Sequence, residues 1–402
     1  MSVPLERLYH YLADCVNHDL LIYRWFPHGS RKIEDLDHLK IYSEFQWYNS
    51  PIAIFHDQEP LDYKFYSQDQ IYNQAKKFFE SRLPVMLKDS VLYYVSQQHI
   101  RGATGLSVNN HDMTILVHSE QNSSELALYE QAGFVPVYYW SHAVIALDWF
   151  RYAEYDPNLN FDLHNITQDF LIYNRAWSGT REYRLTFVEN LITNQLVEYC
   201  KTTFCAVDQN THYLNHVFEN QKFKISNTQL EKYFLPNTYS SVSSADYVAD
   251  DYAVTGIEVV LETLFDDSRW HLTEKALRPI ACGKPFILMA TAGSLQYLRN
   301  HGFETFDGLI DESYDLITDS RARLDAVVQE MKKIAALNSN AKQLLYTKLH
   351  AISQRNRQRF FNGLFDQVIE EYKTNLDCAM TIMNQHRTGI HLARIQELLR
   401  QN

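Results

Sequence analysis

The segment 270–288 constrains the fold more than any other part of this chain. It predicts a helix that runs from Thr273 to Gly283, followed directly by a buried strand. Threonine can accept a hydrogen bond from the first helical turn, and glycine can adopt the left-handed conformation that ends a helix. Glu274 and Lys275 therefore lie in the first turn, where free N–H groups and the helix dipole favour an anion such as a phosphate.

Apolar runs alternate with helix-periodic segments along the rest of the chain. Strands are expected at 20–26, 51–55, 91–95, 114–117, 134–140, 170–173, 256–265 and 285–288. Helices are expected at 123–133, 181–192, 294–300 and 321–337, and from about 342 onwards. The unit from 114 to 140 has short connections, which indicates a parallel sheet with a right-handed crossover. The fold class is therefore α/β.

The chain is long enough for two domains, each with its own core, because it has 402 residues and is 46% apolar. The polar, turn-rich stretch 155–160 favours a boundary there. This predicts an N-terminal domain at 1–160 and a C-terminal domain, with terminal helices, at 161–402. Ligands of such sheets bind at the carboxyl ends of the strands.

Charge and cysteine content narrow the class of protein. A net charge of −12 disfavours a general nucleic-acid coat protein but permits a local basic cleft. The five cysteines contain no Cys-x-x-Cys pair, which disfavours a structural zinc site and favours a reduced, cytoplasmic protein. No signal segment and no apolar run of about 18 residues is present, so no membrane span is expected.

Polar side chains follow two of the expected strands in the second half. Asn174 and Arg175 come directly after the strand at 170–173, and Glu274 and Lys275 open the helix described above. If both loops share one sheet edge, Arg175 and Lys275 converge on a helix N-terminus and can neutralise a diphosphate. Glu274 can then accept hydrogen bonds from ribose hydroxyls. In the competing interpretation both cations are solvated surface groups and Glu274 interacts with the helix dipole.

Three other nucleotide or metal motifs lack support. The chain contains no Gly-x-Gly-x-x-Gly and no P-loop, which are typical of dinucleotide oxidoreductases and of P-loop NTPases. A metal-dependent GT-A glycosyltransferase would present an Asp-x-Asp triplet after a strand. The triplet Asp35-Leu36-Asp37 lies in an expected helix instead, so we interpret it as an incidental surface pair.

The segment 257–315 resembles the nucleotide-sugar-binding region of fucosyltransferase-like and exostosin-like glycosyltransferases. Those families share a Ser/Thr-Glu-Lys helix start, a Pro-Ile/Leu-x-x-Gly helix end and a short strand. The corresponding stretches here are Thr273-Glu274-Lys275, Pro279-Ile280-Ala281-Cys282-Gly283 and Pro285-Phe286-Ile287-Leu288. The continuation to residue 315 resembles a viral and bacterial branch of this group. The stretch 170–184 resembles the strand and arginine-bearing loop earlier in the same domain.

The resemblance implies a GT-B architecture, in which two Rossmann-like domains face a cleft. It implies that Arg175 and Lys275 hold the donor diphosphate and that Glu274 binds the ribose. The resemblance does not fix the base or the sugar, and a UDP- or GDP-linked donor is expected. The same donor site is expected to include Asn174, Arg181 and Thr273. The resemblance also implies an inverting hexosyl- or pentosyltransferase with no obligatory metal and no other cofactor.

Inverting transfer needs a group that takes the proton of the acceptor hydroxyl. Three carboxylates follow expected strands of the N-terminal domain, namely Asp57, Glu59 and Glu120. Asp57 and Glu59 are favoured over Glu120. Each also has a structural alternative: an Asx-turn for Asp57, a loop position before a proline for Glu59, and a helix N-terminus for Glu120.

Two histidines are expected to bind the acceptor. His118 follows the strand at 114–117, and His142 follows the strand that ends at Trp140. A hydrogen bond to the chain is the structural alternative for His118.

Two classes of acceptor fit this chemistry: a glycan, or hydroxymethylated pyrimidines in the DNA of a virus such as a bacteriophage, in the host cytoplasm. A DNA acceptor could use Trp140 or Trp177 to stack on a flipped base. Late arginines would then contact phosphates, although a solvated helix face is the simpler interpretation; they are Arg355, Arg357, Arg359, Arg387, Arg394 and Arg400. The alternative function is a non-catalytic module of the same fold that binds sugar nucleotides or glycans.

Overall fold

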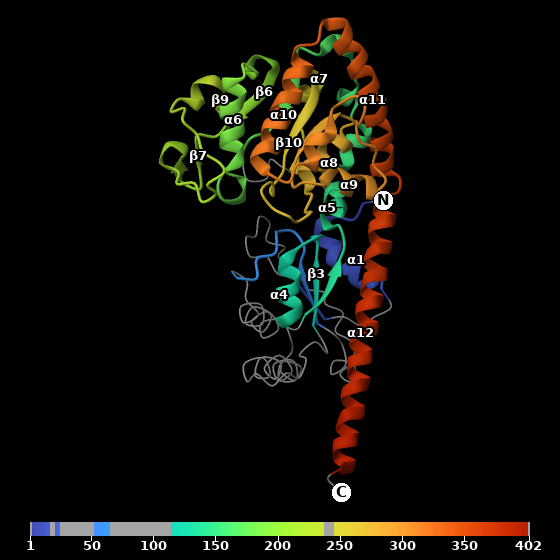
Figure 1. Ribbon diagram of the computed structural model, residues 1–402. Coiled ribbons are helices and arrows are strands. Elements are labelled where there is room, and N and C mark those ends of the chain that lie inside the picture. The colour runs from blue at the N-terminus through green and yellow to red at the C-terminus, as the bar shows by residue number, and fades with distance from the viewer. Residues whose placement is uncertain are drawn as a thin grey trace. The chain divides into compact units, whose positions relative to one another are not determined.

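The computed structural model describes residues 2–16, 21–24, 52–64, 114–132, 134–236 and 245–400 (Figure 1). Contacts divide the chain into two compact units. Unit 1 comprises Met1–Ser2 and His142–Phe365, and unit 2 comprises Val3–Ser141 and Asp366–Asn402. The domain boundary expected at residue 160 differs from this division in two places. Residues 142–160 were expected in the N-terminal domain but belong to unit 1, and residues 366–402 were expected in the C-terminal domain but belong to unit 2.

Unit 2 contains a parallel sheet whose strands follow one another in sequence order, β1-β2-β3-β4. The strands are β1 (Leu21–Arg24), β2 (Ile52–His56), β3 (Thr114–His118) and β4 (Val135–Tyr138). Helix α4 (Ser124–Ala132) connects β3 to β4. The strand–helix–strand unit expected at 114–140 is therefore confirmed, as are the strands expected at 20–26 and 51–55. The strand expected at 91–95 lies outside the described residues.

Two helices from opposite ends of the chain pack on one face of this sheet. They are α1 (Leu8–Asp14) and the long terminal helix α12 (Leu364–Arg400). Phe55 of β2 is fully buried, and its ring centroid lies 5.2 Å from that of Tyr9 in α1 and 6.4 Å from that of Tyr372 in α12. The last helix is thus part of the core of unit 2.

Unit 1 contains a five-stranded parallel sheet of order β11-β10-β5-β6-β9. The strands are β5 (Gln168–Ile172), β6 (Cys200–Phe204), β9 (Leu235–Pro236), β10 (Thr255–Leu261) and β11 (Phe286–Met289). The sequence predicted β5, β10 and β11. It missed β6, because only Cys200 and Phe204 are buried there and the three residues between them are half-buried.

The C-terminal part of the chain is helical, as expected, and so are the segments of unit 1 for which helices were expected. The expected helices of unit 1 run as follows. They are α6 (Tyr183–Thr193), α8 (Glu274–Ala281), α9 (Ser294–Asn300), α10 (Ser320–Ala335) and α11 (Ser339–Phe361). Two further helices, α5 (Ser141–Trp149) and α7 (Ala249–Ala253), and the hairpin of β7 (Val207–Asp208) and β8 (Thr211–His212) were not predicted. In Figure 1 this hairpin lies in one lobe with α6, β6 and β9. The α/β fold class is confirmed.

Helix α8 has both of the ends that its sequence predicts. Thr273 is the N-cap, and its side chain accepts a hydrogen bond from the N–H of Lys275. At the other end Gly283 has φ +66°, and the N–H groups of Gly283 and Lys284 donate to the carbonyls of Ile280 and Pro279 at 3.1 and 2.8 Å. This pair of bonds is the Schellman motif, in which the left-handed residue is normally glycine.

A buried ion pair fixes α8 against the sheet. Arg278 of α8 donates to Glu258 of β10 at 2.6 Å, and their side chains are 6% and 1% exposed. Tyr252 donates to the second oxygen of Glu258 at 2.5 Å. Because removal of either ion would leave the other buried and unpaired, the pair ties the C-terminal half of α8 to the middle of β10.

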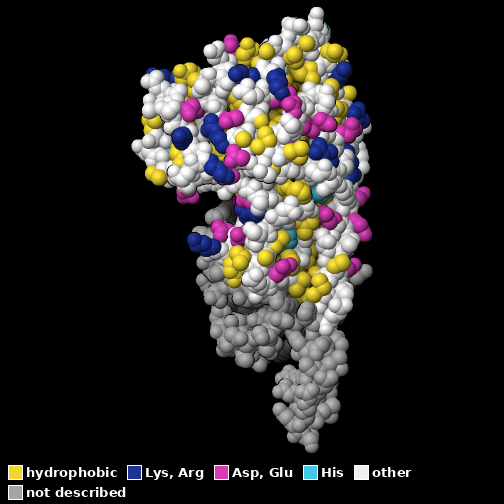
Figure 2. All heavy atoms as spheres, viewed as in Figure 1, with side chains coloured by type: hydrophobic (Ala, Val, Ile, Leu, Met, Phe, Trp, Pro, Cys, Tyr) yellow, Lys and Arg dark blue, Asp and Glu magenta, His cyan; other side chains and the backbone are white. Residues whose placement is uncertain are grey.

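The described surface carries mixed charges. Figure 2 shows acidic and basic side chains interspersed over the face in view, with no continuous basic stripe among the residues described there. No helix in the described part of the chain is both long enough and apolar enough to cross a membrane. All five cysteines are free thiols.

Candidate functional site

The two loops that carry the expected donor residues lie at one edge of the sheet of unit 1. Strands β5 and β10 are parallel neighbours, so their carboxyl ends lie side by side. Asn174 and Arg175 follow β5, and the segment after β10 leads through Glu262 and Thr263 to α8. Open parallel sheets bind their ligands at this edge.

The first turn of α8 is hydrogen-bonded to Glu262, a side chain that sequence reasoning missed. The fully buried carboxylate of Glu262 accepts from the N–H groups of Thr273 and Ala276 at 3.0 and 3.2 Å and from the hydroxyl of Thr273 at 2.7 Å. A carboxylate of the protein therefore takes the position in which a phosphate was expected. The expectation that free N–H groups of this turn bind the anion is corrected accordingly, since those of Thr273 and Ala276 are engaged.

Lys275 lies at the rim of the same turn and is held by three oxygens. Its ammonium donates to Glu274 at 2.9 Å, to Thr273 Oγ1 at 3.1 Å and to Thr263 Oγ1 at 3.4 Å. The side chain is 20% exposed, so its charge is accessible at the sheet edge. The cation is thus oriented by two loops, one from the end of β10 and one from the start of α8.

Glu274 is buried beside two groups that can be cationic. Its carboxylate contacts Lys275, and its Oε2 lies 3.6 Å from Nδ1 of His142, which comes from α5. Burial opposes ionisation, but Lys275 and His142 outweigh it and lower the pKa of Glu274 to about 2. The ring of His271 packs edge-on against His142 at 5.1 Å between centroids. Glu274 is therefore an ionised hydrogen-bond acceptor at neutral pH, and His142, which was expected to bind the acceptor, lies beside it.

Arg175 lies close enough to Glu274 to interact with its charge. Burial and the neighbouring Arg184 lower the pKa of Arg175, while Glu274 and Asp208 raise it. Its side chain is half-buried. The convergence of Arg175 with Glu274 and Lys275 on one ligand stays a prediction, supported by the electrostatic interaction between Arg175 and Glu274. Of the other expected donor residues, Asn174 is fully buried at the end of β5 and Arg181 lies near Asp208.

Two further residues that the sequence did not single out shape this edge. Asp208 accepts from the N–H groups of Trp177 and Ser178, both at 2.8 Å, and so fixes the loop after β5. Arg184 donates to the carbonyls of Ala176 and Leu261, both at 2.6 Å, and so joins that loop to the end of β10. Both side chains make hydrogen bonds to backbone groups outside their own element. A local sequence pattern therefore does not reveal these contacts.

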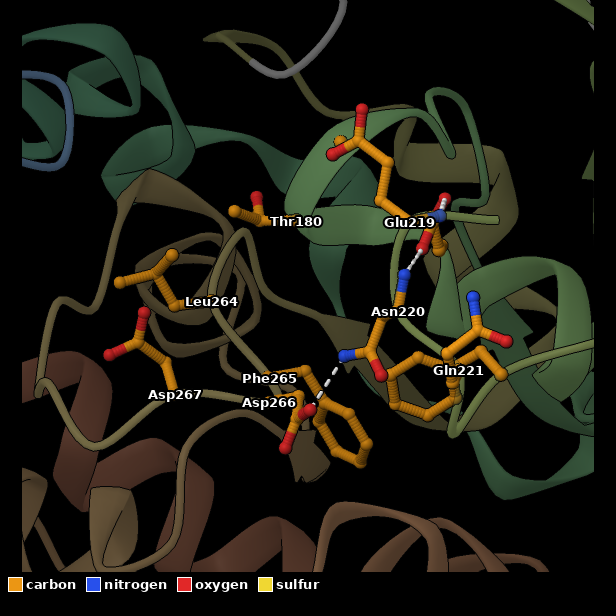
Figure 3. Close-up of a pocket in the computed structure, with 11 residues that line it drawn as sticks. Thr180, Glu219, Asn220, Gln221, Leu264, Phe265, Asp266 and Asp267 are labelled. Atoms are coloured by element: carbon orange, nitrogen blue, oxygen red, sulfur yellow. Dashed lines mark hydrogen bonds between the residues drawn. The ribbon is translucent and has the colours of Figure 1, made fainter. Parts of the chain in front are cut away.

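A cavity of about 430 Å³ opens beside these loops (Figure 3). It is lined by Gly179, Thr180, Glu182, Glu219, Asn220, Gln221, Phe223, Leu264, Phe265, Asp266 and Asp267. The lining residues 264–267 directly follow Thr263, which contacts Lys275. The lining residues 179 and 180 belong to the loop that carries Arg175. The cavity and the two cations therefore share both of their loops.

The chemistry of the cavity differs from that of the cation pair. Its wall carries four carboxylates and two amides, and none of its lining residues is Lys or Arg. Phe223 and Phe265 are almost fully buried, and Figure 3 shows Phe265 beside Asp266 and Asn220. The amide of Asn220 donates to Asp266 at 2.6 Å, which fixes this wall. Aromatic rings and hydrogen-bond acceptors suit a nucleoside better than they suit a phosphate.

Asp57, a base candidate in unit 2, lies in a closed cluster of tyrosines. Its side chain is fully buried, and its carboxylate accepts from the hydroxyls of Tyr9, at 3.0 Å, and Tyr139. Burial and the charge of Asp57 raise the pKa of Tyr139 well above its ordinary value, so this hydroxyl remains a donor. These contacts assign Asp57 a structural role, because its carboxylate is shielded from any acceptor in this conformation.

The remaining candidates in unit 2 differ in exposure. Glu120 is 1% exposed and accepts from the N–H of Leu61 at 2.7 Å, whereas Glu59 is half-buried and keeps contact with solvent. His118 is 2% exposed and lies opposite His56 in the register of β2 and β3. Burial and His56 lower the pKa of His118 to about 3, so its ring is neutral and belongs to the core. The structural alternative therefore fits His118 better than acceptor binding.

The groups considered for DNA are engaged elsewhere. Trp140 and Trp177 are fully buried, so neither ring can stack on a flipped base in this conformation. Arg355 pairs with Glu304 at 2.6 Å, and Arg357 and Arg359 donate to backbone carbonyls. The side chains of Arg387, Arg394 and Arg400, and the triplet Asp35-Leu36-Asp37, lie outside the described part.

Comparison of the chain with protein-family models, with curated proteins and with solved structures found no match. Among the described residues, no group of three or more His, Cys, Asp or Glu side chains is arranged to hold a metal ion.

Proposed function

We propose that this protein is a nucleotide-sugar-dependent glycosyltransferase with a GT-B arrangement of two Rossmann-like domains. The observation that carries the proposal is that the Glu274–Lys275 pair and the loop of Arg175 lie at the same edge of one parallel sheet, beside a cavity of about 430 Å³. In this proposal the two cations bind the donor diphosphate. Glu274 accepts from the ribose hydroxyls and the cavity receives the base.

The fold is consistent with this proposal. Each unit has its own parallel sheet, and the chain returns from unit 1 to unit 2 for its last helix. Parallel sheets place their loops, and so their ligand contacts, at the carboxyl ends of the strands. The expected donor residues of unit 1 follow β5 and β10 at that end.

The chemistry requires a stabilised leaving group and a base. The acceptor oxygen attacks the anomeric carbon, the bond from that carbon to the β-phosphate oxygen breaks, and negative charge develops on the nucleoside diphosphate. Lys275 and Arg175 stabilise that charge, and no metal is part of the proposal. The incoming diphosphate competes with the carboxylate of Glu274 for the ammonium of Lys275. We assign proton removal to Glu59, because Asp57 and Glu120 are buried and hydrogen-bonded to the protein.

The acceptor is proposed to be a hydroxyl of a glycan. The alternative, a hydroxymethylated pyrimidine in viral DNA, loses the support of Arg355, Arg357 and Arg359, whose charges are paired or directed to backbone carbonyls. Binding of duplex DNA with a steep dependence on salt concentration would restore the DNA version.

A ligand screen tests the donor site. The protein is heated with UDP, GDP and their sugars, because a ligand that binds only the folded state raises the melting temperature. We expect at least one of them to stabilise the wild type, and Lys275→Ala and Arg175→Ala to lose that stabilisation. Lys348→Ala, which changes an exposed lysine, serves as the control. Equal stabilisation of Lys275→Ala and wild type would exclude the assigned site.

A second measurement separates transfer from simple binding. The ligand that stabilises the protein, as its sugar-linked form, is incubated with wild type and the release of nucleoside diphosphate is followed. Release that Lys275→Ala abolishes supports the enzyme. Tight binding without any release, with or without glycan acceptors, supports the non-catalytic module instead.

A further inference from the structure

Two tyrosines stand exposed on a single turn of unit 1. They are Tyr152 and Tyr155, with exposed fractions of 67% and 79%, in the 3₁₀ helix Arg151–Tyr155 that follows α5. Side chains three apart eclipse each other in a 3₁₀ helix, with a rise of about 6 Å between them. Both rings therefore lie on one side of the turn, at a spacing of about one sugar ring.

This turn is held rigidly although its rings are exposed. Ala153, between the two tyrosines, is fully buried, and Arg357 of α11 donates to its carbonyl and to that of Glu154. The guanidinium of Arg151 lies 4.4 Å from the centroid of the Tyr152 ring, so it covers one face of that ring. A hydrogen bond to Glu154 raises the pKa of Tyr155 and restrains its hydroxyl. A ligand would thus meet rings that are already placed, which lowers the entropy lost on binding.

The charge around the tyrosines selects the kind of ligand. Three carboxylates of the stretch 148–162 reach the surface, Glu154, Asp156 and Asp162, whereas Asp148 is buried. The basic side chains at the turn are Arg151 and Arg357, and Arg357 is directed to the carbonyls of Ala153 and Glu154. Arg151 is itself paired with Asp148 at 2.9 Å. Such a surface repels nucleic acids, anionic lipids and acidic glycans. It accepts hydrogen bonds from neutral, hydroxyl-rich molecules.

We propose that Tyr152 and Tyr155 form a docking platform for a neutral glycan. The C–H face of a sugar ring is electropositive and apolar, and it stacks on the electron-rich face of an aromatic ring. Sugar hydroxyls donate to Glu154 beside the rings. The platform is separate from the residues assigned to the donor and would hold a polymeric acceptor, so its failure leaves the donor site untouched.

Native affinity electrophoresis of the full chain tests this platform. Gels contain dextran, hydroxyethylcellulose or glycogen as neutral probes, and heparin or single-stranded DNA as anionic ones. We expect retardation of wild type by at least one neutral polymer and by neither anionic polymer. Tyr152→Ala and Tyr155→Ala should each weaken the retardation about tenfold, as expected when a central contact ring is removed. Tyr233→Ala, which removes a different half-exposed ring, should leave it unchanged.

The phenylalanine variants separate stacking from hydroxyl contacts. Tyr152→Phe and Tyr155→Phe keep the aromatic rings and should keep most of the retardation. All variants should have the melting temperature of wild type, because both rings are exposed. The proposal is overturned if no neutral polymer retards wild type, if the alanine variants are retarded equally, or if an anionic polymer binds through these rings instead. A lower melting temperature of the alanine variants would assign the rings to the fold and overturn it as well.

Discussion

The carboxylate of Glu262 accepts hydrogen bonds from both the backbone N–H and the hydroxyl of Thr273, at 3.0 and 2.7 Å. Thr273 Oγ1 in turn accepts from the ammonium of Lys275 at 3.1 Å. A buried anion at the end of β10 thus orients, through one threonine, the cation that we assign to the donor diphosphate. The start of α8 is a place where an anion is stabilised, and the protein supplies that anion itself.

Replacing this anion should weaken both the fold and the site. Glu262→Gln puts an amide donor where an N–H or a hydroxyl already donates, so we expect a loss of about 2–4 kcal/mol in the free energy of unfolding. Affinity for the stabilising nucleoside diphosphate should also fall, because Thr273 no longer holds Lys275 in place. Chemical denaturation and calorimetric titration measure the two effects. The exposed Glu198→Gln is the matched control.

If Glu262→Gln unfolds with the stability of wild type, the hydrogen bonds to Thr273 and Ala276 contribute little and α8 is held by Arg278 and its apolar face alone. An unchanged affinity for the nucleotide in a folded variant would show that Thr273 does not position Lys275.

Asp57 and Glu59 should respond differently to loss of charge. Asp57→Asn disrupts the bonds from Tyr9 and Tyr139, and we expect it to destabilise the protein by about 2–4 kcal/mol. Glu59→Gln changes a half-buried side chain, so stability should stay within about 0.5 kcal/mol of wild type. Turnover of the sugar nucleotide should fall at least about 100-fold in Glu59→Gln, the usual contribution of a general base.

Donor affinity is the control for this pair of variants, since neither residue belongs to unit 1. A Glu59→Gln protein that keeps normal turnover would remove Glu59 as the base. A stable Asp57→Asn protein with no turnover would return that role to Asp57, in a conformation other than the one described.

Local signals in the sequence predicted some features of this protein and could not predict others. The caps of α8 follow from Thr273 and Gly283, because both act within one turn of the helix. The burial of Asp57 depends on Tyr9 and Tyr139, which lie 48 and 82 residues away. A loop after a strand looks the same whether distant tyrosines close over it or leave it open.

The sheet edge that carries Arg175 and Lys275 shows the same difference between local signals and contacts with distant residues. Arg175 and Lys275 stand directly after a strand and at a helix start, so their common edge follows from a parallel sheet. Glu262 and Arg184 make hydrogen bonds to groups that only the folded chain brings close to them. Glu262 accepts from the first turn of α8, and Arg184 donates to the carbonyls of Ala176 and Leu261. The sequence therefore predicted the cations but missed the buried charges that hold their loops.

The end of α8 offers a test of backbone strain against side-chain crowding. Gly283 and Gly308 both have positive φ, +66° and +77°. A Cβ at Gly308 would meet nothing within 4 Å, whereas at Gly283 it would lie 2.5 Å from the amide of Gln354. Gly308→Ala should therefore cost about 1–2 kcal/mol, from the left-handed conformation alone. Gly283→Ala should cost more, and denaturation curves of both variants measure the difference.

The double variant Gly283→Ala with Gln354→Ala removes the closest contact and leaves the strain, together with a 3.2 Å approach to Arg357 Cδ. Relative to the single variant Gln354→Ala, the free energy that Gly283→Ala costs should fall towards the cost of Gly308→Ala. Equal costs for the two single variants would mean that Gln354 moves aside freely.

The buried ring of His118 should make unit 2 sensitive to mild acid. Its pKa is about 3 in the folded protein and about 6.5 when exposed, so the folded state favours the neutral ring. As the pH falls below 6.5, the unfolded chain takes up a proton that the folded chain refuses, and stability is lost progressively until about pH 3. The loss attributable to His118 is about 2 kcal/mol at pH 5 and about 4 kcal/mol at pH 3. Glu274, with a folded pKa of about 2, contributes its own loss only below its ordinary value of 4.5.

Melting temperatures at pH 7 and pH 5 avoid the titration of Glu274, which remains ionised in both states over most of that interval. Burial also lowers the pKa of His350, to about 4, so the contribution of His118 is the difference between wild type and a His118 variant. His118→Asn keeps an acceptor near the N–H of Glu120, which donates to His118 Nδ1 at 3.3 Å, but has no proton to gain. We expect its melting temperature to fall less than that of wild type between the two pH values. The exposed His164→Asn should follow wild type. If His118→Asn and wild type lose the same number of degrees, another group, of which His56 is the nearest candidate, carries the acid sensitivity of this unit.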